Sequence, residues 1–308
     1  MIKNSFFSGI KIETQLSEQS NEIQLPDSIT DVFLGPNIDQ RCKDARNFLV
    51  NTNSHVILYN PKNFMIQFDD EKISVDVFDN FIKNYKFKDG QVLIECSSVG
   101  VAELLLLIGA LYHNGVKKFS ALYLEPKIYK NIGQGLNKLR TFSLSRGYDG
   151  YTAVPGYALS VEPSDYITFC CGFETERIQN AFEDEPIDSN NNSVSLIFGM
   201  PPYSAGWDMN SYDNHIKFID LQGIMNIYFC GASNPLAVIK KLTEEFKGVG
   251  EHKLFIAPLG TKPMSLGVCL FIVKENAPEK IGFLFDHPQK ENGRSSKVNK
   301  WLLYNIEM

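Results

Sequence analysis

The chain has 308 residues, of which 44% are hydrophobic and 12% aromatic, and this composition excludes a disordered or fibrous protein. Its net charge of −6 argues against binding of nucleic acid through a large basic surface, so any anion site must be local. The longest apolar stretch, residues 101–112, contains Glu103 and is shorter than the roughly 20 residues that cross a bilayer. Because the amino terminus has no signal-peptide pattern, we expect a cytoplasmic protein with no membrane span.

Short segments rich in β-branched and aromatic residues alternate with longer helical patterns along the chain. Strands are expected at residues 29–34, 55–59, 92–96, 119–124, 166–171, 195–198, 224–230, 253–257, 281–285 and 301–306. Helices are expected at residues 40–50, 77–85, 101–114, 128–145, 176–182, 234–246 and 264–271. Several strands are continuous apolar runs, which is typical of strands buried on both faces. We therefore predict an α/β, Rossmann-like fold with mainly parallel sheets flanked by helices.

The six cysteines form no CxxC pair and lie mostly in apolar runs, where cysteine behaves as a small hydrophobic residue. The five histidines are scattered along the chain. We therefore expect no metal site, no disulfide framework and no cofactor.

Two segments share the form strand, turn, acidic residue, arginine and helix. They end at Arg41 and Arg177, an offset of 136 residues (177 − 41). Ser97 and Ser233, each in a turn between a strand and a helix, have the same offset (233 − 97). We predict two related halves, residues 1–150 and 151–308, packed as a pseudo-dimer. The alternative is that any α/β chain offers strand–glycine–helix units that can be aligned in this way.

The most specific local pattern is the turn at residues 257–267, which follows a buried strand and opens a helix. Gly260 allows the turn, Thr261 supplies a hydroxyl, Lys262 a cation, and Pro263 suits the first helical turn. A helix amino terminus binds phosphate through its N–H groups and dipole, so Lys262 could add a further contact. An ordinary helix cap with Lys262 in solvent is the alternative.

This turn, Gly-Thr-Lys-Pro-Met at residues 260–264, resembles the strand-to-helix turn of CRISPR-associated Rossmann-fold (CARF) domains. Those domains bind oligoadenylate signals at a dimer interface, and the related SAVED domains fuse two CARF-like units in one chain. The resemblance implies that Thr261 and Lys262 contact a ligand phosphate or ribose. Ser97 and Ser98 resemble the small polar turn that also lines such pockets. The sequence departs from the family at residues 126–130, where the first half lacks the Thr-Lys-Pro string, and it carries no recognisable effector domain.

Arg41 and Arg177 stand near the start of predicted helices, where a cation opposes the helix dipole and needs an anionic partner. That partner could be a ligand. For Arg177 it could instead be Glu174, three residues earlier on the same turn.

Two further loops carry candidate ligand contacts. Residues 293–297 could form a backbone nest for phosphate with Arg294 as its cation, or simply an exposed polar loop. Residues 199–208 contain Tyr203 and Trp207, an aromatic pair that could stack on a base or belong to a plain surface loop.

The leading hypothesis is a duplicated sensor that holds a nucleotide-like ligand between its halves and acts through a partner effector protein. Its setting in bacterial antiviral defence is implied by the CARF resemblance alone. The expected ligand contacts are Arg41, Ser97, Ser98, Glu174, Arg177, Ser233, Thr261, Lys262 and Arg294. One alternative is a nucleotide-cleaving enzyme, with Lys262 and Arg177 stabilising phosphoryl charge and Asp286 or Glu174 transferring protons. The second alternative is a non-catalytic scaffold subunit.

Overall fold

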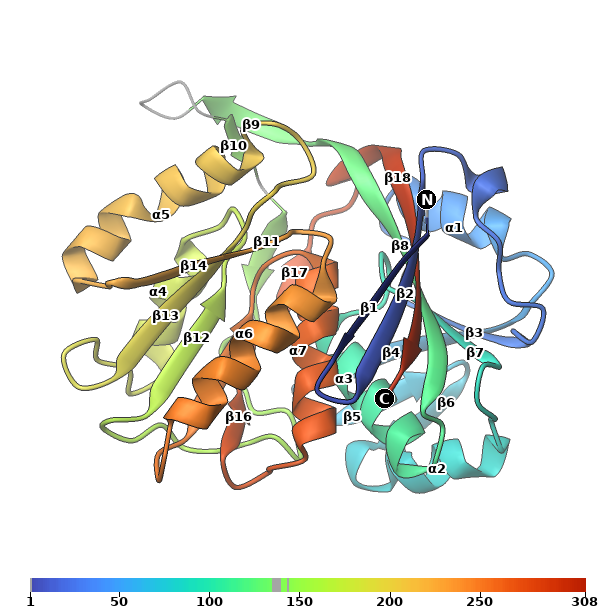
Figure 1. Cartoon of the computed structure of the whole chain (residues 1–308), viewed down its shortest axis with the longest axis horizontal. Coiled ribbons are helices and arrows are strands. Elements are labelled where there is room, and N and C mark those ends of the chain that lie inside the picture. The colour runs from blue at the N-terminus through green and yellow to red at the C-terminus, as the bar shows by residue number, and fades with distance from the viewer. Residues whose placement is uncertain (1, 135–139, 143) are drawn as a thin grey trace. The chain divides into compact units, whose positions relative to one another are not determined.

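The chain divides into two compact units (Figure 1). The computed structural model describes residues 2–134, 140–142 and 144–308. Unit 1 consists of Met1–Tyr129 and Asn292–Met308, and unit 2 consists of Lys130–Glu291. Unit 2 is therefore an insertion between two segments of unit 1. This division differs from the predicted halves because the last strand of the chain pairs with strands of unit 1.

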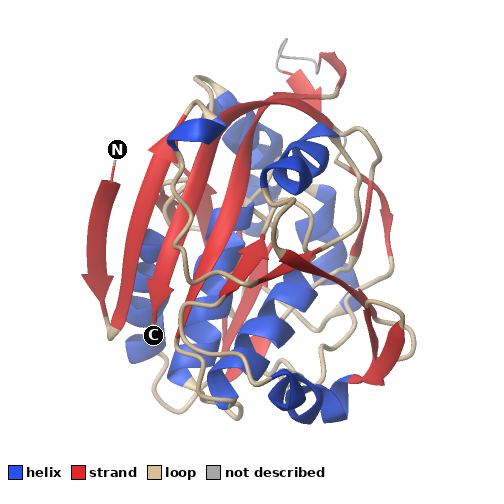
Figure 2. Cartoon of the chain, turned by 90° about the vertical axis from the view of Figure 1, so that its right-hand side faces the viewer, coloured by secondary structure: helices blue, strands red, loops and turns tan. Residues whose placement is uncertain are grey.

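Unit 1 is built on a nine-stranded mixed sheet (Figure 2). Its strands are β1 (Ile2–Phe7), β2 (Ile10–Ser17), β3 (Asp31–Leu34), β4 (Asn53–Asn60), β5 (Met65–Phe68), β6 (Glu71–Ser74), β7 (Val92–Glu95), β8 (Lys118–Tyr129) and β18 (Ser295–Glu307). Their order is β1-β2-β18-β8-β7-β3-β4-β5-β6, with the N-terminal strand at one edge. The central strands β8, β7, β3 and β4 are parallel, and the outer strands are antiparallel to their neighbours.

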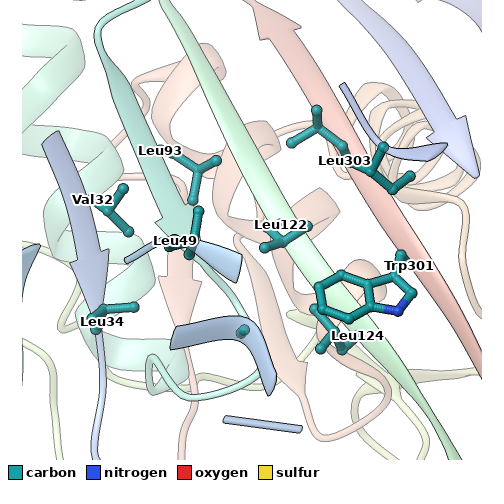
Figure 3. Close-up of a cluster of buried hydrophobic side chains, with 10 residues drawn as sticks. Val32, Leu34, Leu49, Leu93, Leu122, Leu124, Trp301 and Leu303 are labelled. Atoms are coloured by element: carbon teal, nitrogen blue, oxygen red, sulfur yellow. The ribbon is translucent and has the colours of Figure 1, made fainter. Parts of the chain in front are cut away.

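Helices cover both faces of this sheet. They are α1 (Gln40–Phe48), α2 (Phe78–Tyr85) and α3 (Val101–His113), with 3-10 turns η1 (Ser20–Glu22) and η2 (Val75–Val77). The α1 face holds a buried apolar cluster (Figure 3) of Ile23, Val32, Leu34, Ala45, Leu49, Leu93, Leu122, Leu124, Trp301 and Leu303. Phe33 alternates with Val32 and Leu34 along β3 and so points to the other face. There it packs on Phe68, which in turn contacts Phe81 of α2.

Unit 2 contains a five-stranded sheet in which every strand is parallel to its neighbours. Its strands are β12 (Tyr166–Cys170), β13 (Ser193–Gly199), β14 (Asn226–Cys230), β15 (Leu254–Pro258) and β16 (Ile281–Phe283). Their order is β14-β13-β12-β15-β16. Four helices join successive strands: α4 (Glu176–Asp184), α5 (Trp207–Gln222), α6 (Pro235–Gly248) and α7 (Lys262–Glu275).

The helices of unit 2 form two layers, one on each face of the sheet. Consecutive residues of β12 point to opposite faces. Phe169 packs on Phe182 of α4, which meets Phe218 of α5 at 5.1 Å between ring centroids. The Thr168 hydroxyl instead donates to Glu245 of α6 at 2.5 Å, and α6 packs against α7. Hence α4 and α5 cover one face, and α6 and α7 cover the other.

The helix predicted at residues 128–145 is wrong wherever the structure describes that segment. β8 extends to Tyr129 because it pairs with β18 along its whole length. It is followed by short strands, β9 (Asn131–Gln134), β10 (Arg140–Phe142) and β11 (Ser145–Tyr148), the last paired with β17 (Pro288–Lys290). Glycines at 133 and 135 weaken a helix here. Residues 135–139 and 143 lie outside the described residues.

The ten predicted strands and the other predicted helices are present, with ends shifted by a few residues. One helix, α5, is not predicted, because its first residues fall in the expected loop at 199–208. Its buried face has regular helical spacing but includes Asn210, Ser211 and His215. A periodicity of apolar residues therefore misses it.

In the observed sheets, one of the two residue pairs with an offset of 136 occupies matching positions and the other does not. Arg41 and Arg177 both lie at the second residue of the helix that follows the first parallel strand of their unit. Their offset thus links matching positions. Ser97 follows β7, which borders β3, whereas Ser233 follows β14, which β13 separates from β12. The equal offset of the two serines does not link matching strands.

Two findings concern the whole described chain. No described helix is both long enough and apolar enough to span a membrane. All six cysteines are buried and carry free thiols.

Close packing of α6 on α7 depends on Gly267. A Cβ at this position would lie 2.5 Å from the Pro235 carbonyl oxygen, well inside contact distance. Gly267→Ala should therefore lower the free energy of unfolding by about 1–3 kcal/mol in urea titrations, despite the better helix propensity of alanine. Gly248→Ala, at the end of α6, is the matched control because a Cβ there meets nothing within 4 Å. Equal stability of the two variants would contradict this packing.

His215 should make stability depend on pH. It is fully buried, with Nδ1 2.7 Å from the Ser211 carbonyl oxygen, and burial lowers its pKa from 6.5 to about 4. The unfolded chain therefore takes up the proton first, so this stabilisation is present above pH 6.5 and is lost as the pH falls towards 4. We expect a loss of up to about 3 kcal/mol in unfolding experiments. This pH-dependent loss of stability should vanish in His215→Leu. It should persist in His252→Leu, which replaces an exposed histidine.

Candidate functional site

The predicted ligand contacts fall into two sets, one in each unit. Arg41, Ser97, Ser98 and Arg294 belong to unit 1, and Glu174, Arg177, Ser233, Thr261 and Lys262 belong to unit 2. Except for Arg294, which precedes β18, they lie in turns or first helical turns after parallel strands. Such carboxyl ends are where open α/β sheets bind ligands.

In unit 2 the turns after β12 and β15 lie against each other. A Cβ on Gly172, after β12, would be 2.6 Å from the carbonyl oxygen of Leu259, after β15. Glycine is required because any side chain would collide with main chain. β12 and β15 are also the strands at which the chain changes its direction of travel across the sheet. The contact therefore brings the first turn of α4 close to the turn that opens α7.

Thr261 caps α7 and joins its turn to the turn after β14. The Thr261 hydroxyl accepts from the Met264 N–H at 3.4 Å and donates to the Ala232 carbonyl oxygen at 2.6 Å. The same carbonyl accepts from the Tyr203 hydroxyl at 3.2 Å. Ser233 follows Ala232 and is partly exposed. The structure thus places Ser233 and Thr261 in adjoining turns, with the threonine hydroxyl already used as a cap.

Lys262 is the first residue of α7 and is partly exposed. No acidic residue lies in the first turn of this described helix. In unit 1, the corresponding helix α3 follows β7, the neighbour of β3, and its N-cap is Gly100. A Cβ on Gly100 would lie within 2 Å of the Glu103 carboxylate, so this carboxylate occupies the place of a capping side chain. The two matching helix ends therefore carry opposite charges.

Arg177 pairs with a carboxylate from a distant part of unit 2. Its Nε and Nη2 donate to the two oxygens of Asp286 at 2.7 and 2.6 Å. Its Nη1 donates to the Leu259 carbonyl oxygen at 3.4 Å. Burial alone would lower the pKa of Arg177, but the fully buried Asp286 carboxylate raises it above its ordinary value. The guanidinium is thus a fixed charge that ties α4 to the turns after β15 and β16.

Glu174 does not pair directly with Arg177. One of its oxygens accepts from the Leu144 and Ser145 N–H groups at 3.0 and 2.9 Å, and the other accepts from the Ser145 hydroxyl at 3.0 Å. The i, i+3 ion pair considered from the sequence is therefore replaced by bonds to the start of β11. A ligand contact by Glu174 remains a prediction.

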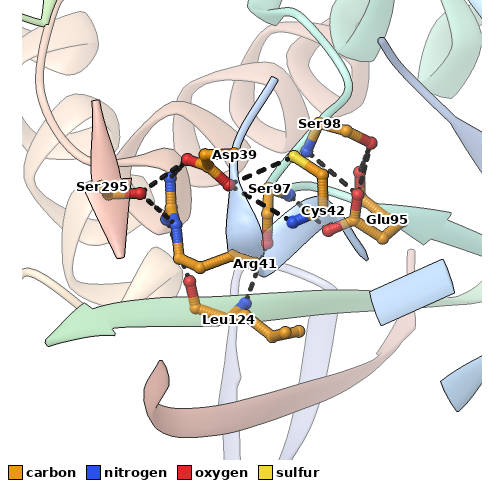
Figure 4. A network of polar contacts seen from close by, with 8 residues as sticks. All are labelled: Asp39, Arg41, Cys42, Glu95, Ser97, Ser98, Leu124 and Ser295. Atoms are coloured by element: carbon orange, nitrogen blue, oxygen red, sulfur yellow. Dashed lines mark hydrogen bonds and ion pairs between the residues drawn. The ribbon is translucent and has the colours of Figure 1, made fainter. Parts of the chain in front are cut away.

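In unit 1 the two serines belong to a buried polar network (Figure 4). The Glu95 carboxylate accepts from the N–H groups of Ser97 and Ser98 at 2.7 and 3.0 Å and from the Ser98 hydroxyl. Ser97 Oγ accepts from the Leu124 N–H, and Ser98 Oγ from the Gly35 N–H. Both serines are 1% exposed. Their hydroxyls hold β3, β7 and β8 together, and ligand contact by them remains a prediction.

Arg41 is equally embedded (Figure 4). It donates to Asp39 at 2.8 Å, to the Leu124 carbonyl oxygen at 3.0 Å and to the Ser295 hydroxyl at 2.7 Å. Burial acts to raise the pKa of Asp39, but Arg41 and the Ser295 hydroxyl hold it below its ordinary value. Arg294 immediately precedes Ser295 and is partly exposed.

The aromatic pair of residues 199–208 is buried within unit 2. Trp207 is 7% exposed and packs on Phe142 and Phe173, with ring centroids 5.8 and 5.9 Å away. Tyr203 is 9% exposed and bonds to the main chain of Ala232. Both aromatic rings are packed in the core of the unit, so this structure does not support their stacking on a base.

Sequence reasoning missed Glu95 and Glu103, the buried carboxylates that organise the unit 1 turns. The spacing of Gly100 and Glu103 is that of a capping box, a pattern that could have identified the second of them. Within the described residues, no cluster of three or more His, Cys, Asp or Glu side chains could hold a metal ion. Comparison of the sequence with protein-family models and with curated proteins gives no match.

Removal of Asp286 should lower the free energy of unfolding far more than removal of an exposed ion-pair partner. Asp286→Ala leaves the Arg177 charge buried without compensation, so we expect a loss of about 3–5 kcal/mol in urea unfolding. Replacing both residues, as Arg177→Met with Asp286→Leu, should recover part of this loss. Lys118→Met, which breaks the exposed pair with Glu307 at 3.1 Å, should cost less than about 1 kcal/mol. Similar losses for Asp286→Ala and Lys118→Met would contradict the assignment.

Proposed function

We propose that the protein is a sensor that binds a nucleotide, or a related phosphate-bearing small molecule, in unit 2 without cleaving it. The ligand phosphate lies at the turn between β15 and α7. Lys262 contacts it, and the first turn of α7 contributes main-chain N–H groups and the positive end of the helix dipole. Ser233 and Thr261, in the adjoining turns, line the same site.

The observation that carries this proposal is the difference between the amino ends of α3 and α7. At α3 the Glu103 carboxylate lies where a capping side chain would be, and an internal anion repels an external one. At α7 the cap is the neutral Thr261, the next residue is Lys262, and no acidic residue follows in the first described turn. Anion binding is therefore favoured at the unit 2 helix and disfavoured at the unit 1 helix.

The strand order of unit 2 supports the same location. Numbered along the chain, the parallel strands lie in the order 3-2-1-4-5, which is typical of a doubly wound Rossmann-like sheet. Ligands of such sheets bind at the carboxyl edge beside the point where the strand order reverses. In unit 2 that point lies between β12 and β15, directly beside Gly260–Lys262.

The acidic side chains near this turn favour binding over cleavage. Asp286, a candidate for proton transfer, receives two hydrogen bonds from Arg177 and is fully buried. Glu174, the other candidate, receives three hydrogen bonds from Leu144 and Ser145 at the start of β11. A general acid or base must be free to reach its substrate, so neither side chain suits that role as it is held.

The proposal extends to the origin of the units and to the setting. The positions of Arg41 and Arg177, and the close glycine contacts at Gly35 and Gly172, support two units related as pseudo-repeats. Cytoplasmic antiviral defence and a separate effector partner rest on the resemblance of residues 260–264 to CARF domains.

A panel of linear and cyclic nucleotides, added to the full chain, tests this function through thermal shift and chromatography of the nucleotide. We expect stabilisation by a member of the panel, which is recovered intact. Lys262→Ala should raise its dissociation constant about tenfold to a hundredfold, the effect of losing one charge-assisted hydrogen bond.

Lys274→Ala is the matched control, since it removes the same charge from the last turn of the same helix. It should change affinity less than about twofold, because the dipole effect is confined to the helix ends and Lys274 is at the opposite one. Breakdown of the nucleotide would establish the enzyme alternative instead. If no nucleotide either stabilised the protein or was broken down, both the sensor and the enzyme would be rejected. Full affinity in Lys262→Ala would reject the site.

A further inference from the structure

Unit 1 holds a second group of cations around the amino end of α1. Arg41 is 2% exposed, and its guanidinium bonds to Asp39, Ser295 and the main chain of Leu124. Both carboxylate oxygens of Asp39 also accept hydrogen bonds from within the protein. One oxygen accepts from Arg41 and the Ser295 hydroxyl, and the other accepts from the N–H and thiol of Cys42. This single carboxylate therefore compensates a single arginine.

Arg294 brings a second guanidinium to the same place. The preceding residue, Gly293, has φ +66° and donates its N–H to the Ile38 carbonyl oxygen at 2.9 Å, just before the cap of α1. The following residue, Ser295, bonds to both Arg41 and Asp39. The main chain of Arg294 is thus held on both sides against the start of α1.

The Arg294 side chain has a buried donor that no described residue satisfies. Its Nε is inaccessible to solvent and has no hydrogen-bond acceptor in the described chain, although the residue is partly exposed. A buried donor without a partner is costly, and a second cation beside Arg41 adds repulsion. Burial and the charge of Arg41 accordingly lower the pKa of Arg294.

Two tyrosines complete this cluster, and a tyrosine side chain is ordinarily uncharged near pH 7. Tyr129 pairs with Ser295 across the β8–β18 ladder, and Tyr123 lies with its ring centroid 6.0 Å from the Arg41 guanidinium. Burial raises the pKa of Tyr129, although both arginines act in the opposite sense. The cluster of Asp39, Arg41, Tyr123, Tyr129 and Arg294 therefore carries one uncompensated positive charge.

We propose that this cluster is an anion site for a phosphate group, distinct from the site at Lys262. Arg294 is the residue that contacts the phosphate, through its planar guanidinium, which matches phosphate oxygens in a bidentate manner. Arg41 is a positioning residue, since it fixes Ser295 and adds its charge. The proposal stands on unit 1 alone and does not depend on the function proposed for unit 2.

Inorganic phosphate and pyrophosphate are the probes, titrated by calorimetry into the full chain carrying Lys262→Ala, which removes the unit 2 contact. We expect binding of at least one of them. Arg294→Gln in the same background should weaken it about tenfold or more. Lys297→Gln, an equal change in net charge at an exposed position of β18, should weaken it less than about twofold. Binding by a nucleotide but by neither inorganic probe would assign the site to a phosphate ester and leave Arg294 as its contact.

A stability measurement gives a second readout. In phosphate-free buffer Arg294→Gln should melt at the same temperature as the parent chain or higher, because it removes the buried Nε donor that has no acceptor and the charge that repels Arg41. Pyrophosphate should raise the melting temperature of the parent and not that of the variant. Absence of any anion binding in the Lys262→Ala chain, or equal binding by Arg294→Gln and Lys297→Gln, would overturn this proposal and leave the unit 2 site untouched.

Discussion

A close main-chain contact at the carboxyl ends of the parallel strands of each unit constrains the turns around it. In unit 1, a Cβ on Gly35 would lie 2.3 Å from the Ser98 carbonyl oxygen, and in unit 2 a Cβ on Gly172 would lie 2.6 Å from that of Leu259. Only glycine allows two turns to approach so closely. Each contact joins the turn after the first parallel strand to the turn after its neighbour. The first turns of α1 and α4 are thereby fixed beside that neighbouring turn, and with them Arg41 and Arg177.

Because the Arg41 side chain is buried and that of Arg177 is largely buried, each arginine charge must be compensated by groups of the protein. The two units do so differently. Arg41 takes its carboxylate from Asp39, the cap of its own helix, whereas Arg177 takes Asp286 from the turn after β16, two strands away in the sheet. Each arginine also donates to a main-chain carbonyl, that of Leu124 or Leu259. The acidic groups at both edges are consequently used to stabilise the fold, and this leaves them poorly suited to catalysis.

Local patterns predicted most elements, and failures occurred where long-range pairing or polar burial decided the structure. The strands at 92–96 and 253–257 are apolar runs and were predictable. The strand that begins at Lys118 continues to Tyr129 because it pairs with β18, more than 160 positions later in the chain. The helix α5 escaped prediction because its buried face contains Asn210, Ser211 and His215.

The candidate site shows the same division. Arg41 and Arg177, which the sequence paired by their offset, are each the second residue of their helix, since the pattern around each arginine is local. Their partners could not be predicted in the same way. Asp286 is 109 residues from Arg177, and only the strand order brings it there. Ser97 and Ser233 matched in offset but follow strands with different neighbours, so the sequence alone could not exclude that pairing.

The third residue of α3 and of α7 accounts for the difference in charge between the amino ends of these two helices. Position for position from their caps, Glu103 of α3 corresponds to Met264 of α7, because Gly100 and Thr261 are the two N-caps. Glu103 turns its carboxylate back over a cap that has no side chain. Met264 is fully buried beneath Gly199 and Gly260, so the end of α7 is left to the Thr261 hydroxyl and to Lys262. An acidic side chain places a negative charge at the first helix end, and an apolar one leaves the dipole of the second uncompensated by any carboxylate of its own first turn.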